Sequence, residues 1–302
     1  MQDACCLGLP EGFRGGSGGE FLGRLGSFGL GVLNRPGFAL RAYFWYHSLR
    51  RVGEYAVSTD EKAITLGRPS YVWRFGQQRR LDLIREHVEL EGARILDVGC
   101  GVGMYVRHLG IYSDQVYGVD VDPEKVEEAS KTLPNIEVAA AESLPFDDGF
   151  FDVVLLHEVL EHVDDDLRSV AEAWRVLAPG GRIVVFVPNR LYAFETHGVY
   201  WRGRYREGNV PLVNYLPDAL RRRMCPHVRA YTIRGIRRLF DGLPGRMMVH
   251  TCMYPGYDKI AARSRWLAVT LRAATYVLEC TPLRFLGLSH FLVFQKVQSE
   301  SG

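Results

Sequence analysis

Short apolar runs alternate with segments of helical periodicity through most of the chain. A helical stretch near 77–91 is followed by five runs that are rich in β-branched residues and lack polar alternation. Strand and helix in alternation predict a parallel sheet, and strands without a polar face are typical of a sheet covered by helices on both sides. The runs are ARILDVG, QVYGVD, IEVAA, FDVVLLH and GRIVVFVP, with the helical patterns PEKVEEASKTL and DLRSVAEAWRVLAP between some of them.

This rhythm breaks at 190–230, a segment rich in aromatic residues, proline and arginine that shows no sustained periodicity. We interpret it as an insertion over the edge of the sheet. After it, YTIRGIRRLF predicts a helix, MMVHTCM a strand, and HFLVFQKV a final strand, with an amphipathic stretch from Lys259 to Leu278 between the two strands. The pattern places an α/β domain at 86–297.

Two segments precede that domain. Residues 1–37 are rich in glycine, which disfavours regular helix, so we expect an irregular or mobile N-terminus. Residues 38–85 begin with FALRAYFWYHSLRR, which is aromatic and basic and has no acidic neighbour between Glu20 and Glu54. This segment is either a helix at a membrane interface or a set of aromatic side chains that pack on the main domain.

Composition narrows the class of protein. The formal net charge is +2, too close to zero to require a nucleic-acid partner. The six cysteines have no spacing typical of a zinc site or a disulfide framework, which favours a reducing cytosol. The sequence has neither a long apolar span nor a signal peptide at its start, so we expect a cytoplasmic protein with at most peripheral contact to the inner face of a membrane.

A glycine-rich turn follows the first predicted strand. The run ILDVGCGVG brings three glycines to the end of that strand, where backbone can approach a ligand closely. A dinucleotide fingerprint needs its third glycine at position 104, but this chain has Met104 there and Gly103 before it, which argues against NAD. The Asp97 carboxylate precedes the turn, where it could hold loop amides or face the amino group of an amino-acid-like ligand.

Two further strand ends carry nucleotide-like features. Asp120 ends the second strand at the distance from the glycine turn at which an acidic residue accepts both hydroxyls of a ribose. The segment AAAESLPF follows the third strand, where backbone amides and Glu142 could border an adenine. Each motif is weak alone, but all three in order indicate a nucleotide-like ligand at the carboxyl ends of the strands.

Together these motifs resemble the class I S-adenosylmethionine-dependent methyltransferases of the type 11-like group. The resemblance is close over Arg94–Asn189 and looser to residue 297, through ILDVGCGVG, GVDVDPE, AESLPFDDGFFDVV, HEVLEHV and VLAPGGRIVVFVPN. It implies a Rossmann-like, seven-stranded, mostly parallel sheet with helices on both faces, an insertion after strand five, and an antiparallel last strand. It also implies S-adenosyl-L-methionine as the cofactor.

The resemblance further implies which residues hold that cofactor. Where relatives often have an acidic residue before the Ala-Glu pair, this chain has Ala140. The implied residues are Asp97, Gly99, Cys100, Gly101 and Gly103 for the methionine part, Asp120 for the ribose, Ala141 and Glu142 for the adenine, His157 close to the methyl group, and Val121 as a further cofactor contact.

Transfer of a methyl group to an oxygen acceptor requires a base. His157 ends the fourth strand in LLHEVLEH and is the first candidate, because histidine titrates near neutrality. A histidine that only shapes the pocket fits equally well. His197 is a second candidate and follows the fifth strand with Tyr192, Tyr200 and Trp201, which would line the acceptor site or pack within the insertion.

The run HEVLEH does not match the HExxH zinc motif, because position 161 is Glu. Glu158, Glu161 and His162 form ExxEH, whose three residues would share one face of a helix and could bind a divalent ion. Similar sequences serve as metal sites in some methyltransferases of small RNAs and of ubiquinone precursors, whereas many relatives carry EVLEH without a known metal. The sequence leaves this metal site open.

The acceptor is not specified by any motif. Ten arginines but only two acidic residues lie between Trp201 and Phe240, and arginine suits phosphate or carboxylate. With the apolar stretch Leu267–Leu278, these residues favour a small-molecule or amphipathic acceptor at an anionic surface, or else form a solvated basic face. A cofactor-binding scaffold or regulator without catalysis is one alternative. An RNA-modifying methyltransferase is a weaker one, because no RNA-binding module is evident.

Overall fold

A computed structural model describes residues 72–206 and 208–297 of the chain. The expectations for 1–37 and for the aromatic run at 38–51 therefore lie outside the described residues.

The strands are β1 (Ile95–Val98), β2 (Val116–Asp120), β3 (Ile136–Val138), β4 (Phe151–His157), β5 (Leu177–Pro188), β6 (Phe194–Glu195), β7 (Val199–Trp201), β8 (Arg204–Arg206), β9 (Val210–Pro211), β10 (Gly245–Met253) and β11 (Ser289–Lys296). The helices are α4 (Phe75–His87), α5 (Met104–Leu109), α6 (Pro123–Ser130), α7 (Asp166–Val176), α8 (Asp218–Met224), α9 (Ile233–Arg238), α10 (Asp258–Ala261) and α11 (Arg265–Glu279), with short 3-10 helices η2 (Val213–Tyr215) and η3 (Pro282–Leu286).

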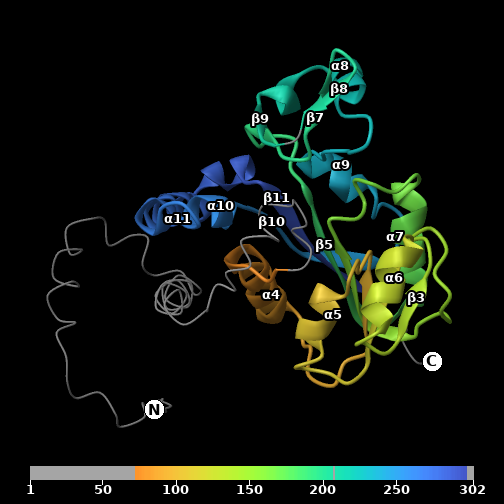
Figure 1. Ribbon diagram of the computed structural model, residues 1–302. Helices are drawn as coiled ribbons and strands as arrows, with labels where there is room; N and C mark the ends of the chain where they lie inside the picture. The colour runs from red at the N-terminus through yellow and green to blue at the C-terminus, as the bar shows by residue number, and fades with distance from the viewer. Residues whose placement is uncertain (1–71, 207, 298–302) are drawn as a thin grey trace, which may run out of the picture. The chain divides into compact units, whose positions relative to one another are not determined.

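Seven strands form one sheet in the order β10-β11-β5-β4-β1-β2-β3 (Figure 1). The strands β1 to β5 pair in parallel, and β11 is antiparallel to both β5 and β10. The expected seven-stranded, mostly parallel sheet with an antiparallel last strand is therefore confirmed. Strand order reverses at β1, where β2 lies on one side and β4 on the other, and open α/β sheets bind ligands at such a switch point.

Apolar side chains cover both faces of this sheet, as unbroken apolar strands require. Successive residues of a strand point to opposite faces. In β1, Leu96 and Val98 belong to a buried cluster with residues of α7 and α9, whereas Ile95 belongs to a second cluster with residues of α4 and α5. Helices on both faces, predicted from the lack of polar alternation, are thus present.

The helix α4 belongs to the packed core. Leu81 and Ile84 are each 1% exposed and lie in the same cluster as β1 and β4, and Val72 is also buried. The expected start of the domain at residue 86 is therefore too late. The sequence pattern missed this because α4 is mostly polar and buries only a narrow stripe on the sheet.

The insertion at 190–230 lies beyond the carboxyl ends of the central strands rather than over a lateral edge of the sheet (Figure 1). It holds the strand pairs β6–β9 and β7–β8 with η2 and α8. Backbone hydrogen bonds join its end to the sheet: the amide of Tyr231 donates to Pro188 O, and that of Arg229 donates to Glu161 O. The insertion follows β5, and β5 is an inner strand of the sheet. The insertion therefore leaves the sheet at the end of this strand rather than at a lateral edge.

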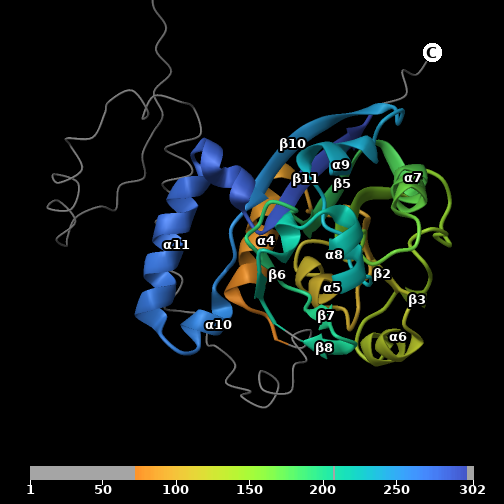
Figure 2. The same cartoon turned by 90° about the horizontal axis from the view of Figure 1, so that it is seen from above.

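The stretch Lys259–Leu278 divides into α10 and α11, which meet at Ser264. The Ser264 side chain accepts a hydrogen bond from the amide of Leu267 and caps α11, so a new helix starts there. Figure 2 shows α11 beside β10 at one end of the sheet. Within 72–206 and 208–297, no helix is long and apolar enough to span a membrane.

Candidate functional site

The glycine turn after β1 has the backbone that its sequence predicts. Gly99, Gly101 and Gly103 have φ values of 72°, 55° and 77°, a region that other residues rarely adopt. A Cβ atom on Gly99 would lie 2.4 Å from Val159, and one on Gly103 would lie 2.2 Å from Leu133. A Cβ on Gly101 would meet no atom within 4 Å. The middle glycine therefore borders open space, whereas the outer two are needed for packing.

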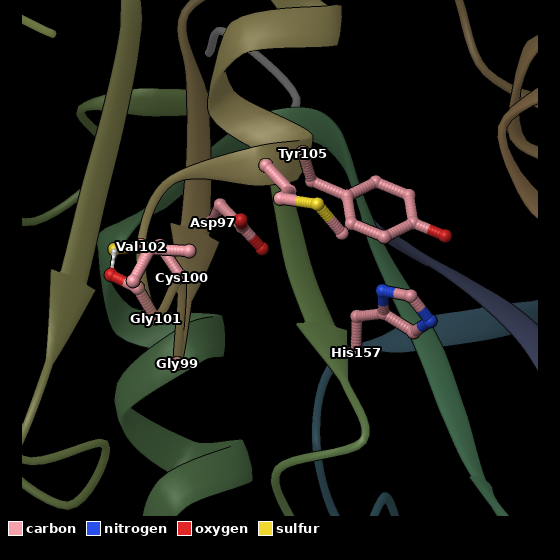
Figure 3. Close-up of a pocket in the computed structure, with 8 residues that line it drawn as sticks. Asp97, Gly99, Cys100, Gly101, Val102, Tyr105 and His157 are labelled. Atoms are coloured by element: carbon pink, nitrogen blue, oxygen red, sulfur yellow. Dashed lines mark hydrogen bonds between the residues drawn. The ribbon is translucent and has the colours of Figure 1, made fainter. Parts of the chain in front are cut away.

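A pocket lies over this turn, between the carboxyl ends of β1 and β4. Figure 3 shows Tyr105 and His157 side by side, next to Asp97 and the glycine turn. The ring centroids of Tyr105 and His157 are 4.2 Å apart in an edge-on contact. The pocket is lined by Asp97, Gly99, Cys100, Gly101, Val102, Met104, Tyr105 and His157.

Two carboxylates stand at the ends of neighbouring strands β1 and β2. Asp120 accepts hydrogen bonds from the amides of Gly101 (2.8 Å) and Asp122 (2.9 Å) and so anchors the turn. Asp97 is 3% exposed. Its burial, together with the nearby charge of Asp120, raises the pKa of Asp97 to about 8. Asp97 is therefore mostly protonated at neutral pH and would ionise more readily beside a bound cation.

The residues expected to border ribose and adenine follow β2 and β3 and are not among the residues that line the pocket. Val121 is 71% exposed, which is unusual for a valine directly after a buried strand. Ala141 is buried. The Glu142 carboxylate accepts hydrogen bonds from the amides of Asp164 (3.0 Å) and Asp165 (3.3 Å) and so ties its segment to the loop before α7.

His157 lies in the pocket as expected, but its surroundings differ from those of a base. Its Nε2 atom lies 2.5 Å from Nη1 of Arg80, and its ring also packs edge-on against Phe186. Burial, and then the positive charge of Arg80, lower the pKa of His157 to about 3. Because an arginine N–H can only donate, the Nε2 lone pair is occupied. This arrangement favours the pocket-shaping role over the role of a proton acceptor.

Comparison with known proteins identifies the segment that carries this pocket. Residues 96–185 match the family model described as a methyltransferase domain. The chain therefore contains a methyltransferase domain at 96–185. The family and the fold imply S-adenosylmethionine as the cofactor.

Relatives of this methyltransferase domain are similar over part of the chain. A ubiquinone biosynthesis O-methyltransferase from Xanthomonas oryzae pv. oryzae is 36% identical over 121 residues, which are 38% of this chain and 51% of the relative. The chain thus spans about half the length of the curated relatives it matches. A solved S-adenosylmethionine-dependent methyltransferase from Mesorhizobium loti superposes with a TM-score of 0.52 at 18% identity, over 71% of this chain and 96% of the other. The cyclase SpnF superposes with a TM-score of 0.50 at 20% identity, over 75% and 83% of the two chains.

Arg80 is a residue of this site that sequence reasoning missed. It lies on α4, outside the methyltransferase domain match, and forms an ion pair with Glu158 at 2.8 Å. It also donates a hydrogen bond to Ser289 of β11 at 3.0 Å. Burial is the largest single influence on Glu158 and would raise its pKa, but the charges of Arg80, His157 and His197 together outweigh burial and lower that pKa. No spacing in the sequence relates α4 to β4, so only tertiary packing shows this contact.

The ExxEH segment does not lie on a helix. Residues 158–164 form turns, and α7 begins only at Asp166. Glu158 has a φ of 58°, which directs the chain away from helix immediately after β4. The three side chains therefore do not share a helical face, and Glu158 is directed to Arg80 instead.

The structure brings Glu161 and His162 together with His197, the second candidate base of the sequence analysis. One potential ligand atom from each of the three lies within 4.8 Å of the others. Nδ1 of His162 contacts His227 O at 3.2 Å, and Nδ1 of His197 contacts Glu195 Oε1 at 3.1 Å. An oxygen acceptor at Nδ1 places the hydrogen there and leaves Nε2 with a lone pair.

Glu161 is the most constrained member of this cluster. It is 1% exposed, and neither carboxylate oxygen has a hydrogen-bond partner within the described residues. Burial, and then the charge of Glu158, raise its pKa well above the usual value. A buried carboxyl group in this position is either protonated or in need of a cation.

Proposed function

We propose that this protein transfers the methyl group of S-adenosylmethionine to a small-molecule acceptor. The observation that carries the proposal is the pocket at the carboxyl ends of β1 and β4, in which the open side of Gly101 lies beside the buried Asp97. The methionine part of the cofactor would contact the turn at Gly101, and its ammonium group would favour the ionised form of Asp97. Asp120, which fixes the turn, would accept the ribose hydroxyls.

Transfer is an in-line displacement at the methyl carbon, so the main contribution of the protein is alignment of the acceptor. Tyr105 and His157 form the pocket wall on the side of β4 and would bound the space for the acceptor. The Xanthomonas relative is named an O-methyltransferase of ubiquinone biosynthesis, which supports an oxygen acceptor on a small molecule. We therefore propose a hydroxyl group as the methylated position.

A hydroxyl acceptor must lose its proton during transfer, and we propose that a divalent cation at Glu161, His162 and His197 promotes this loss. The orphaned carboxylate of Glu161 and the two Nε2 atoms supply an oxygen and two nitrogens, a donor set suited to zinc and similar borderline ions. Such an ion would act as a Lewis acid on the acceptor oxygen and ease release of the hydroxyl proton to solvent water, while the C–S bond of the sulfonium breaks as the new C–O bond forms. Glu195, which holds Nδ1 of His197, would orient that ligand.

The test of the cofactor assignment is calorimetric titration of the full chain with S-adenosylmethionine. We expect binding by the wild type, loss of at least about tenfold in affinity for Asp120→Ala, and no change for Asp114→Ala, whose side chain is exposed after α5. Absence of binding to folded wild-type protein would refute the proposed function.

Transfer itself is tested with radiolabelled cofactor and a panel of phenolic acceptors, with and without an apolar tail, and structured RNA. Methylation of a phenol supports the proposal. Cofactor binding without transfer to any substrate indicates the scaffold alternative, and transfer to RNA alone indicates the RNA-modifying alternative.

The cation is tested independently of activity, by metal analysis of the purified full chain and by titration with Zn²⁺ and Mn²⁺. We expect one bound ion in the wild type, its loss in Glu161→Gln and His197→Ala, and its retention in Glu124→Gln, which alters an exposed carboxylate on α6. If the wild type binds neither metal, Glu161 is a protonated acid beside Glu158 and the cation proposal fails.

A further inference from the structure

The helix α11 is amphipathic in the opposite sense from an ordinary surface helix. Trp266 is 85% exposed, Leu267 52% and Val277 58%, whereas Arg272 is only 4% exposed. At 100° per residue, these three apolar residues share one face with Thr270 and Ala274, and Arg272 lies on the opposite face. The face of α11 that packs on the protein therefore carries Arg272 beside the fully buried Ala268, and the face with Trp266, Leu267 and Val277 points to solvent.

Polar contacts fix this orientation. Arg272 Nε donates to Gly256 O at 2.7 Å, and its guanidinium lies over the ring of Phe75 at 3.8 Å. Glu279 forms an ion pair with Arg79 of α4 and accepts a hydrogen bond from the Tyr254 amide at 2.6 Å. Rolling α11 to bury its apolar face would leave these charged groups without their partners, which is costly.

Two further exposed apolar side chains lie in η3, which contacts α11. Leu283 is 44% exposed and Phe285 38%. We use the name outer face for the exposed apolar side chains Trp266, Leu267, Val277, Leu283 and Phe285. Apolar patches of this kind on a folded protein mark sites of interaction.

Exposed basic residues border the outer face. Lys259, Arg263 and Arg265 lie near the start of α11, and Arg284 lies in η3. No acidic residue occurs between Asp258 and Glu279, and the carboxyl groups of both are engaged with arginines on the protein side. Within 258–284, the exposed charges beside the outer face are therefore basic.

We propose that the outer face binds the surface of an anionic phospholipid bilayer. A helix that lies in the interface buries an apolar face with an aromatic anchor and places basic residues at the headgroups, and α11 offers both. A second copy of the chain is a poorer partner, because the same basic rim would face itself without an acidic counterpart. The charge complementarity selects the membrane.

Contacts connect this surface to the pocket. Arg79 joins α4 to Glu279 of α11, and the next residue, Arg80, contacts His157 in the pocket. A bilayer at the outer face would lie on the α4 side of the site, from which an acceptor with an apolar tail could enter. Membrane binding itself requires neither cofactor nor acceptor, so its failure would leave the proposed methyl transfer untouched.

The test is sedimentation of the full chain with vesicles made of equal parts of phosphatidylcholine and phosphatidylglycerol. We expect wild-type protein in the pellet at low salt, less at high salt, and little with phosphatidylcholine alone. The double variant Trp266→Ser with Leu267→Ser, and separately Arg263→Glu with Arg265→Glu, should each weaken partitioning by about tenfold or more. Leu167→Ser on α7 is the control, because Leu167 is 57% exposed outside the outer face.

A second measurement is fluorescence quenching by brominated lipids. These lipids should quench the part of the wild-type tryptophan fluorescence that is missing in Trp266→Phe. Wild-type protein that stays in the supernatant, or serine variants that sediment as strongly as wild type while their circular dichroism is native, would overturn the proposal. Lipid-free sedimentation that shows a dimer lost in the same serine variants would assign the outer face to a second copy instead.

Discussion

Arg80 and His157 are 77 residues apart in the chain, yet their side chains lie 2.5 Å apart in the pocket. The contact joins the first described helix to the end of the fourth strand. The sequence indicates His157 as a base, but in the structure His157 accepts a hydrogen bond from Arg80 instead. The neighbouring ion pair between Arg80 and Glu158 holds the guanidinium in place.

Replacement of Arg80 by Met should raise the pKa of His157 from about 3, because the second cause of its depression is removed. The pKa should stay below the ordinary value of 6.5, because burial is the larger cause. Titration of the histidine resonances by NMR measures the change. The control is Arg94→Met, which removes an arginine that pairs with Asp152. A His157 that titrates near pH 6.5 in the wild type would contradict this account of the pocket.

Asp97→Asn should stabilise the protein at neutral pH and weaken cofactor binding. In the wild type, the unfolded chain releases the Asp97 proton near pH 4, whereas the folded protein keeps it up to about pH 8. The stability that this proton provides is fully present below pH 4 and is lost as pH rises through 8. The Asp97→Asn variant should not show this decrease in the free energy of unfolding, which urea unfolding at pH 5 and pH 8 measures. Asp114→Asn, which alters an exposed carboxyl group, is the control.

Cofactor binding should also release a proton near neutral pH, because the ammonium group of the ligand favours ionised Asp97. Calorimetric titrations in buffers of different ionisation enthalpy measure this release. We expect affinity to increase as pH rises toward 8 in the wild type and to be nearly independent of pH in Asp97→Asn. Equal proton release by the two proteins would show that another group is responsible.

Gly101→Ala should cost about 1–2 kcal/mol of stability because of its positive φ, and should reduce cofactor affinity strongly because its methyl group would enter the ligand space. Gly242→Ala is a matched control, because Gly242 also has a positive φ of 84° and open space around its Cβ, but lies in a surface turn. The two variants should unfold at similar urea concentrations and differ in calorimetric titration. Similar affinities would place the cofactor elsewhere.

Arg221→Met should destabilise the protein by about 3–5 kcal/mol, because it removes the arginine that pairs with the buried Glu195 carboxylate. Arg221 Nη2 lies 2.5 Å from Glu195 Oε2, and the two side chains are 6% and 2% exposed. Burial would raise the pKa of Glu195, but hydrogen bonds from His197 and the charge of Arg221 lower it to about 2. Adding Glu195→Gln should recover part of the loss in urea unfolding. If Arg221→Met were as stable as the wild type, the ion pair between Arg221 and Glu195 would not be what stabilises the insertion.

The order of helices and strands, the two covered faces and the glycine turn at Gly99–Gly103 could be predicted from the sequence. These features depend on interactions between near neighbours in the chain: the period of the apolar residues and the need for glycine at positive φ. Asp97 and Asp120 were predicted for the same reason, because strand order brings the ends of neighbouring parallel strands together. The ExxEH helix failed because the φ of Glu158 is set by tertiary packing and not by helical spacing.

The sequence by itself therefore determined the fold class and the glycine turn, and tertiary structure decided which distant side chains meet. Arg80 with His157, and Glu161 with His197, are contacts between separate elements that no local pattern encodes. The orientation of α11 is likewise decided by tertiary contacts. Its periodicity shows an apolar and a polar face, but the choice of inner face depends on partners such as Arg79 and Gly256, which lie elsewhere in the chain.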